Sequence, residues 1–155
     1  MNLDVTADTK PDVVHNLNVT PWPFPENRFR AINAYDVLEH LDDLLAVMSE
    51  VHRICRPGGI VKITVPHYSN WRAFTDPTHR HYFGYSSFDY FTSQSEWSFY
   101  TRVRFKPLTK KLVFQPTLTN KVVHRLANRY PKEYEERWAW MFPAWFLYFE
   151  LEALK

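Results

Sequence analysis

The chain has 155 residues with 45% hydrophobic and 23% charged content, which is typical of globular proteins. Its formal net charge of +2 gives no argument for a nucleic-acid or membrane partner, and its single cysteine excludes an intramolecular disulfide. No signal-peptide pattern opens the sequence, and the longest apolar run, 138–149, is too short to cross a bilayer. We therefore expect one domain over 1–155, a cytoplasmic location, and neither a nucleic-acid nor a membrane partner.

The N-terminal part of the sequence predicts short strands and loops. Met1 to Val5 is a candidate strand with Asp4 at its C-terminal end, and Val13 to Leu17 is a second short apolar run. Pro21 to Pro25 contains three prolines, which donate no backbone hydrogen bond. This stretch is therefore expected to be irregular.

A strand, a helix and a strand form the centre of the sequence. Ala31–Tyr35 is mostly apolar, and Asp36–His40 connects it to Leu41–Cys55, where apolar residues recur at helical spacing. Pro57–Gly59 is a helix stop, and Ile60–Val65 is rich in β-branched residues. A unit of this length predicts two parallel strands joined by a helical crossover.

The segment His67–Phe83 follows the second strand of this unit, at the sheet edge where open α/β proteins bind ligands. The rest of the chain predicts a short helix, a hairpin of two strands, two helices and a final strand. In order, these are Ser86–Phe91, Phe99–Phe105 with Lys111–Gln115, Asn120–Asn128, Lys132–Phe142 and Trp145–Glu152. The aromatic patch around Pro143 is either core or a dimer surface.

Three blocks of sequence stand out in their order and spacing. They are Pro21–Phe29 (PWPFPENRF), Asp36–Leu41 (DVLEHL) and Glu50–Gly59 (EVHRICRPGG). Together they resemble the class I S-adenosylmethionine-dependent methyltransferases, and the resemblance extends from Asp4 through the last strand. It implies an α/β fold with a Rossmann-like sheet, mostly parallel with antiparallel C-terminal strands. In that family a first strand and a glycine loop precede the position of Asp4, so we expect an N-terminally truncated domain.

The resemblance also implies S-adenosylmethionine as the cofactor. Asp4 matches the acid that binds the ribose hydroxyls in the family, and Asn16 with Leu17 matches the position that contacts adenine. An amide oxygen at Asn16 can still accept the hydrogen bond of the adenine amino group. The residues expected to face the methionine end of the cofactor are Asn33, Tyr35 and Asp36.

The candidate catalytic residues are histidines. Methyl transfer from a sulfonium depends mainly on placement, with a base for acceptors that must lose a proton. His40 is interpreted as a base or substrate contact, or as a helix-entry residue, and His67 and His79 as further catalytic candidates. The set His67, Asp76, His79 and His81 also suits zinc or iron, but the side chains of His79 and His81 would diverge on a strand. The segment is thus a substrate loop, a metal site or a structural turn, and no metal ligand is assigned.

The leading hypothesis is an S-adenosylmethionine-dependent methyltransferase that acts on a small-molecule or unknown acceptor. A non-catalytic binding or scaffold protein with the same fold is the first alternative, because the glycine loop is absent. A metal-dependent hydrolase built on the His67–His81 loop is the second. The strand Ala31–Tyr35 would expose an unpaired edge, so we expect a homodimer or a partner that covers it.

Overall fold

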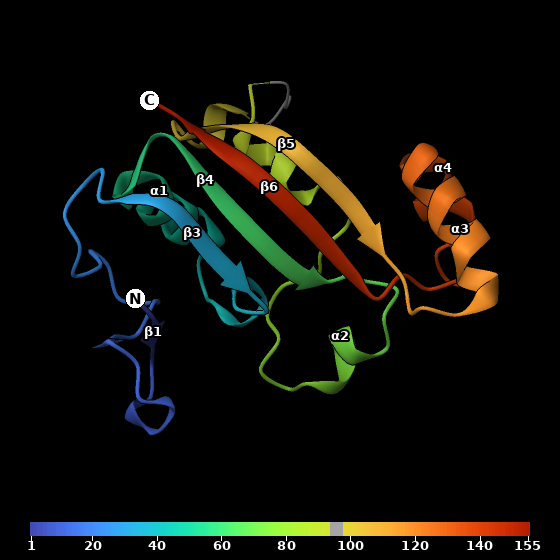
Figure 1. Ribbon diagram of the computed structural model, residues 1–155, viewed down its shortest axis with the longest axis horizontal. Helices are drawn as coiled ribbons and strands as arrows, with labels where there is room; N and C mark the ends of the chain where they lie inside the picture. Colours follow the sequence, from blue (N-terminus) through green and yellow to red (C-terminus); the bar gives the residue numbers. More distant parts are fainter. Residues whose placement is uncertain (94–97) are drawn as a thin grey trace.

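The computed structural model describes residues 1–93 and 98–155, and the strands of these residues form two separate sheets (Figure 1). Two short parallel strands, β1 and β2, make a small unit beside the main sheet. The main sheet has the order β3-β4-β6-β5, in which β3 and β4 are parallel and the other two pairs are antiparallel. The strands are β1 (Leu3–Asp4), β2 (Val13–Val14), β3 (Phe29–Tyr35), β4 (Cys55–Pro66), β5 (Arg104–Val113) and β6 (Phe146–Leu154).

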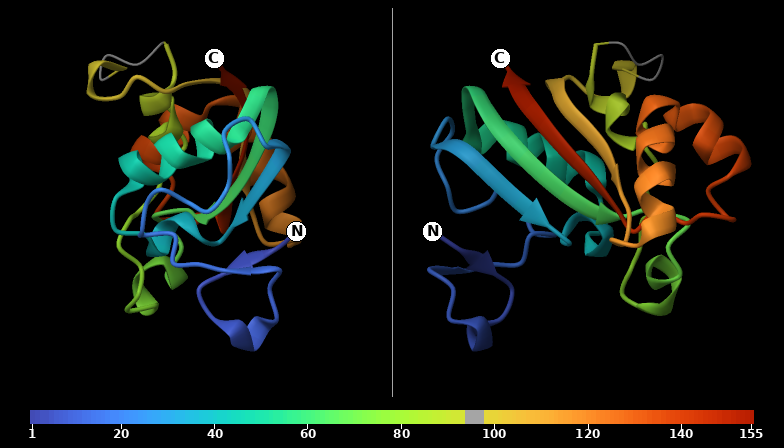
Figure 2. Two further views of the ribbon diagram at one scale, coloured as in Figure 1. Left: turned by 90° about the vertical axis from the view of Figure 1, so that its left-hand side faces the viewer. Right: turned by 45° about the vertical axis from the view of Figure 1, so that its right-hand side comes forward.

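The helices lie on one side of the main sheet and at one end of it. Figure 2 shows α1 on one side of the sheet, and α3 and α4 lie beside the end of β5. The helices are α1 (Leu44–Ile54), α2 (Arg72–Thr75), α3 (Leu118–Arg129) and α4 (Pro131–Arg137), with the 3₁₀ turns η1 (Ala7–Thr9), η2 (Leu38–His40), η3 (Ser87–Phe91) and η4 (Ser98–Tyr100). In the described ranges, none of these helices has the length and apolar character needed to cross a membrane.

The predicted strand–helix–strand unit is confirmed, since β3 and β4 are parallel and α1 connects them. The helix begins later than predicted because Asp43 caps it, with Oδ1 accepting a hydrogen bond from Ala46 N at 3.0 Å. It ends at Ile54, and Cys55 already belongs to β4. Gly58, with a φ of +71°, lets the chain turn where the register between β3 and β4 shifts.

The two faces of the main sheet differ in character. Along β4 and β6 every second side chain is buried, and the side chains between them are partly exposed. The buried ones are Val61, Ile63, Val65, Leu147, Phe149 and Leu151, which pack with α1 residues such as Met48 and Val51 in one core. The opposite face carries Lys62 and Glu150, whose charged atoms lie 3.4 Å apart. This alternation is what a sheet with one solvated face requires.

The predicted hairpin of Phe99–Phe105 and Lys111–Gln115 is wrong. One continuous strand, β5, runs through the expected loop and pairs with β6 along its length. Pro107 is tolerated because β5 lies at the edge of the sheet and its register shifts between Pro107 and Thr109. Proline lacks the N–H that an inner strand needs, and edges and bulges are where it fits in a sheet.

The remaining C-terminal predictions hold with changed bounds. The predicted helix Asn120–Asn128 and the final strand correspond to α3 and β6, but the helix predicted over Lys132–Phe142 ends at Arg137. Three large apolar residues that follow are not core, because Trp138, Trp140 and Met141 are 49%, 69% and 65% exposed. They form turns, in which Met141 N donates to Trp138 O at 3.0 Å.

Two side chains of α1 fasten the irregular proline-rich stretch to the fold. Arg53 donates to the carbonyl oxygens of Phe24 (2.8 Å) and Trp22 (3.1 Å), and Trp22 N donates to Glu50 Oε2 (2.7 Å). Arg53 also donates two hydrogen bonds to the Glu50 carboxylate, at 2.8 and 2.7 Å. The side chains of α1 therefore satisfy backbone groups that have no strand or helix partner.

Candidate functional site

The ends of β3 and β4 meet at one edge of the main sheet. Asp36 follows β3 with a φ of +54°, a conformation that residues other than glycine seldom adopt. Its backbone N donates to Thr64 O at 2.9 Å, and its Oδ1 accepts a hydrogen bond from Thr64 Oγ1 at 3.1 Å. Because strained backbone of this kind gathers at functional sites, this edge is the first place to look for one.

The segment 67–83 folds back over η2 at this edge. The backbone N–H groups of Arg80 and His81 donate to Glu39 O at 2.7 and 3.3 Å. His79 thereby lies beside His40, with the ring centroids 4.7 Å apart in an edge-to-face arrangement. One ligand atom from each of Glu39, His40 and His79 lies within 4.8 Å of the other two. We call these three residues the Glu39–His40–His79 cluster.

Hydrogen bonds fix which ring nitrogen of each histidine in the cluster carries a proton. His79 Nδ1 lies 3.0 Å from Ala73 O, which can only accept, so this nitrogen donates. Thr78 Oγ1 donates to Asp76 Oδ1 at 2.6 Å, and it therefore accepts a hydrogen bond from His40 Nδ1 at 2.9 Å. In the neutral form of each ring, Nε2 is left with its lone pair.

Glu39 is the buried member of the cluster. It is 1% exposed, and its Oε2 atom has no hydrogen-bond partner among the described residues. Burial raises the pKa of Glu39 to about 7, and the nearby carboxylates of Asp36 and Asp76 add to the rise. A buried carboxylate of this kind takes up a proton or a cation near neutral pH.

His67, the third catalytic candidate from the sequence, lies elsewhere. It is fully buried, and its Nδ1 atom accepts a hydrogen bond from Ser69 N at 3.1 Å. Nε2 then carries the proton and donates to Glu135 Oε1 at 3.1 Å. The structure thus brings His40 and His79 together, and it places His67 in a contact between the segment 67–83 and α4.

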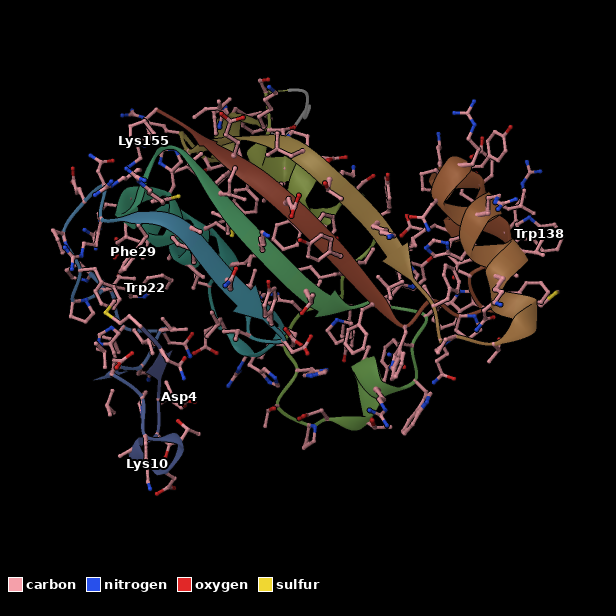
Figure 3. The ribbon with its side chains drawn as sticks, viewed as in Figure 1. Asp4, Lys10, Trp22, Phe29, Trp138 and Lys155 are labelled. Atoms are coloured by element: carbon pink, nitrogen blue, oxygen red, sulfur yellow. The ribbon has the colours of Figure 1, made fainter. Side chains whose placement is uncertain are left out.

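A cavity of about 460 Å³ lies between the β1–β2 unit and β3. Of the predicted cofactor residues, Leu17, Asn33 and Tyr35 line it, and Trp22 and Phe29 supply part of its apolar wall. Figure 3 shows Asp4 on the β1–β2 unit, with Trp22 and Phe29 above it. The volume is in the range of ligand pockets, and no glycine of the described residues lines it.

The other predicted cofactor residues do not line this cavity. Asp4 Oδ1 accepts a hydrogen bond from Thr6 N at 3.1 Å, and this bond lowers the pKa of Asp4, so the carboxylate is ionised at neutral pH. Asn16 Oδ1 accepts a hydrogen bond from Asn18 N at 3.0 Å, and Asp36 directly follows Tyr35. Of the predicted cofactor residues, the polar ones that line the cavity are therefore Asn33 and Tyr35.

Sequence reasoning missed Glu39 and Thr78 as members of the site. The sequence Asp76-Pro77-Thr78 does indicate the turn that places Thr78 and His79, because an aspartate before proline favours a turn closed by the aspartate side chain. Asp76 Oδ1 indeed accepts a hydrogen bond from Thr78 N at 2.9 Å. His79 therefore closes a turn and does not lie on a strand, so the expectation that the side chains of His79 and His81 diverge on a strand does not apply.

Comparison with known proteins gives both a sequence match and a fold match. Residues 3–63 match a protein-family model described as a methyltransferase domain. An uncharacterized methyltransferase of Schizosaccharomyces pombe is 46% identical over 39 residues, which are 25% of this chain and only 14% of that protein.

Solved structures share the fold over nearly the whole chain. A SAM-dependent methyltransferase from Archaeoglobus fulgidus aligns with 97% of this chain and 74% of its own, at a TM-score of 0.58 and 16% identity. A putative Haloferax volcanii methyltransferase, solved in complex with the Trm112 activator, aligns with 99% of this chain and 71% of its own, at a TM-score of 0.60 and 14% identity. Residues 3–63 are thus similar to a methyltransferase domain, and the chain shares the fold of solved S-adenosylmethionine-dependent methyltransferases.

Proposed function

We propose that this chain is the catalytic unit of an S-adenosylmethionine-dependent methyltransferase that acts on a small-molecule acceptor. The observation that carries the proposal is the cavity beside β3, lined by Leu17, Asn33 and Tyr35, at the sheet edge that also holds the Glu39–His40–His79 cluster. In open α/β sheets, ligands bind at this edge.

Each predicted residue has a role that its chemistry supports. The cofactor supplies a methyl group on a positively charged sulfur. Asp4 accepts hydrogen bonds from the ribose hydroxyls, and Asn16 and Leu17 hold the adenine. The methionine end is held by Asn33, Tyr35 and Asp36. These residues bind and orient, which is the main requirement of an in-line displacement.

His40 accepts the proton from acceptors that must lose one. Its Nε2 atom has a lone pair, because Nδ1 donates to Thr78, and Thr78 in turn donates to Asp76 at 2.6 Å. The carboxylate at the end of this chain of hydrogen bonds stabilises the imidazolium that forms. His79, at 4.7 Å between ring centroids, keeps the His40 ring in place.

Calorimetric titration with S-adenosylhomocysteine tests the proposal. We expect micromolar binding, and about tenfold weaker binding for Asp4→Ala, because one charge-assisted hydrogen bond is lost. Asp8→Ala, which changes an exposed acid in the neighbouring η1 turn, should bind like the unmodified chain. Absence of binding at millimolar ligand would contradict the proposal and favour a non-catalytic protein with this fold.

We also infer that a second copy of the chain covers the free edge of β3, where it would complete the wall of the cavity and not fill it. Among the described residues β3 pairs with β4 alone, so one row of its backbone N–H and C=O groups has no strand partner. Exposed edges of this kind pair readily with another strand. Light scattering at micromolar concentration should give twice the monomer mass of 18.6 kDa. A monomer at every concentration tested would refute the dimer.

A further inference from the structure

The Glu39–His40–His79 cluster contains more hydrogen-bond acceptors than donors. Both histidines use Nδ1 as the donor to Thr78 or Ala73, and the described residues supply no hydrogen bond to Nε2 of either ring. Glu39 Oε2 is buried and also lacks a partner there. Two lone pairs and one carboxylate oxygen therefore meet without a hydrogen bond between them, and Asp76 Oδ2 lies 3.9 Å from His79 Nε2. This arrangement is costly for the buried carboxylate unless a proton or a cation joins it.

The hydrogen bonds behind the two rings are those that metal-binding histidines make. A ligating histidine donates its other N–H to a carbonyl or a polar side chain, and this contact fixes both tautomer and ring orientation. His79 donates to a backbone carbonyl, and His40 donates to Thr78, which is anchored by Asp76. We propose that Glu39, His40 and His79 bind a divalent transition-metal ion of the zinc or ferrous type, which two imidazoles and one carboxylate suit.

The spacing and the charge of the cluster agree with this proposal. Metal–ligand bonds of about 2.0–2.2 Å place ligand atoms roughly 3.4 Å apart in a tetrahedral site. In the structure the ligand atoms of Glu39, His40 and His79 lie within 4.8 Å of one another, so side-chain shifts of about 1 Å would bring them to this spacing. Arg80, on the folded-back segment, forms an ion pair with Asp42 at 2.7 Å and not with Glu39. The side chain of His79 is 8% exposed and His40 is partly exposed, so a ligand from solvent would reach the cluster on the His40 side.

This site differs from the set that the sequence suggested. His67 is engaged by Ser69 and Glu135, and Asp76 acts behind His40 through Thr78. The proposal stands on its own geometry and does not require methyl transfer. A bound ion would use the Nε2 lone pair of His40, so His40 would then be a ligand and would not accept a proton from the acceptor.

Cobalt(II) titration of the full chain, purified without a histidine tag and treated with a chelator, tests the proposal. We expect one equivalent of cobalt to bind, with visible ligand-field bands, and zinc to displace it. His79→Ala and Glu39→Gln should each weaken binding by about tenfold or more. Thr78→Val, which removes the hydroxyl that joins His40 Nδ1 to Asp76, should weaken it by about tenfold. His124→Ala, on α3, should leave binding unchanged, and circular dichroism of each variant checks its fold.

Two results would overturn the proposal. The first is failure of the folded chain to take up cobalt or zinc. The second is uptake that persists unchanged in the folded Glu39→Gln and Thr78→Val variants, since the ion would then lie elsewhere. Neither result depends on S-adenosylhomocysteine binding, so failure of the metal site and failure of the proposed activity can be told apart.

Discussion

Replacing Glu135 with alanine is expected to lower the free energy of unfolding by about 2–4 kcal/mol. One oxygen of this side chain, Oε1, accepts hydrogen bonds from His67 Nε2 at 3.1 Å and from Tyr85 N at 2.6 Å. His67 is fully buried, so its N–H loses its partner without gaining water. The Glu135 carboxylate can approach the backbone this closely because Gly84 has no side chain. A Cβ atom on Gly84 would lie 2.9 Å from Glu135 Oε1.

The neighbouring residue gives a matched control. Glu136 is more than half exposed and has a long contact of 3.9 Å with Lys132, one turn earlier in α4. Such surface pairs contribute little, so Glu136→Ala should change stability by less than about 0.5 kcal/mol. Urea unfolding of both variants measures the difference. Equal stability of the two variants would show that the Glu135 contacts carry no net energy.

Glu135→Ala also tests how the Glu39–His40–His79 cluster is held in place. Glu135 joins α4 to both ends of the segment that begins at His67 and reaches Tyr85, and His79 lies within this segment. Without these contacts, we expect faster amide hydrogen exchange across residues 67–85 and unchanged exchange in α1. Uniformly faster exchange would point to a global effect and not to a local anchor.

The central part of the fold was predictable because local signals agree there. Apolar residues at helical spacing, the Pro57–Gly59 stop and the β-branched run 60–65 all favour the same strand–helix–strand unit, and the structure confirms it. The parallel pairing of β3 with β4 follows from the crossover length alone.

The edge strand β5 was not predictable in the same way. A proline inside a β-rich run usually indicates a loop, and Pro107 led to a predicted hairpin. Whether proline breaks a strand depends on which neighbour the strand has, and that is a property of the whole sheet. Only the position of β5 beside β6, with its free edge outward, makes a single strand possible.

The candidate site shows a related limit. His40 lies in a motif, so the sequence indicates it as a candidate, and Glu39 directly precedes it. Their partner His79 lies about forty residues further along the chain, and the link between them is a pair of backbone hydrogen bonds, from Arg80 N and His81 N to Glu39 O. No side-chain pattern encodes such a contact, because any residue type can make it.

Replacing Glu50 with glutamine is expected to cost about 2–3 kcal/mol of stability at neutral pH. The carboxylate is largely buried and receives hydrogen bonds from Arg53 and from Trp22 N. Glutamine keeps the shape of the side chain but removes the charge, which leaves the Arg53 guanidinium without its counter-ion. The proline-rich stretch, which Arg53 also holds through Trp22 O and Phe24 O, then loses its anchor on α1.

The pH dependence gives the sharper form of this prediction. Hydrogen bonds from Arg53, and then from Trp22, hold the pKa of Glu50 below its ordinary value. A depressed pKa in the folded state stabilises the protein above the unfolded pKa of about 4.3, and this stability is lost as the pH falls through the folded pKa. The gap between the unmodified chain and Glu50→Gln should therefore be full at pH 7 and shrink in acid. The control is Glu26→Gln, because Glu26 is exposed; its stability in urea unfolding should differ little from that of the unmodified chain at pH 7 or in acid.

If Glu50→Gln lowers the free energy of unfolding by the same amount at pH 7 and in acid, the loss comes from packing. A charge effect must vanish when the carboxylate is protonated.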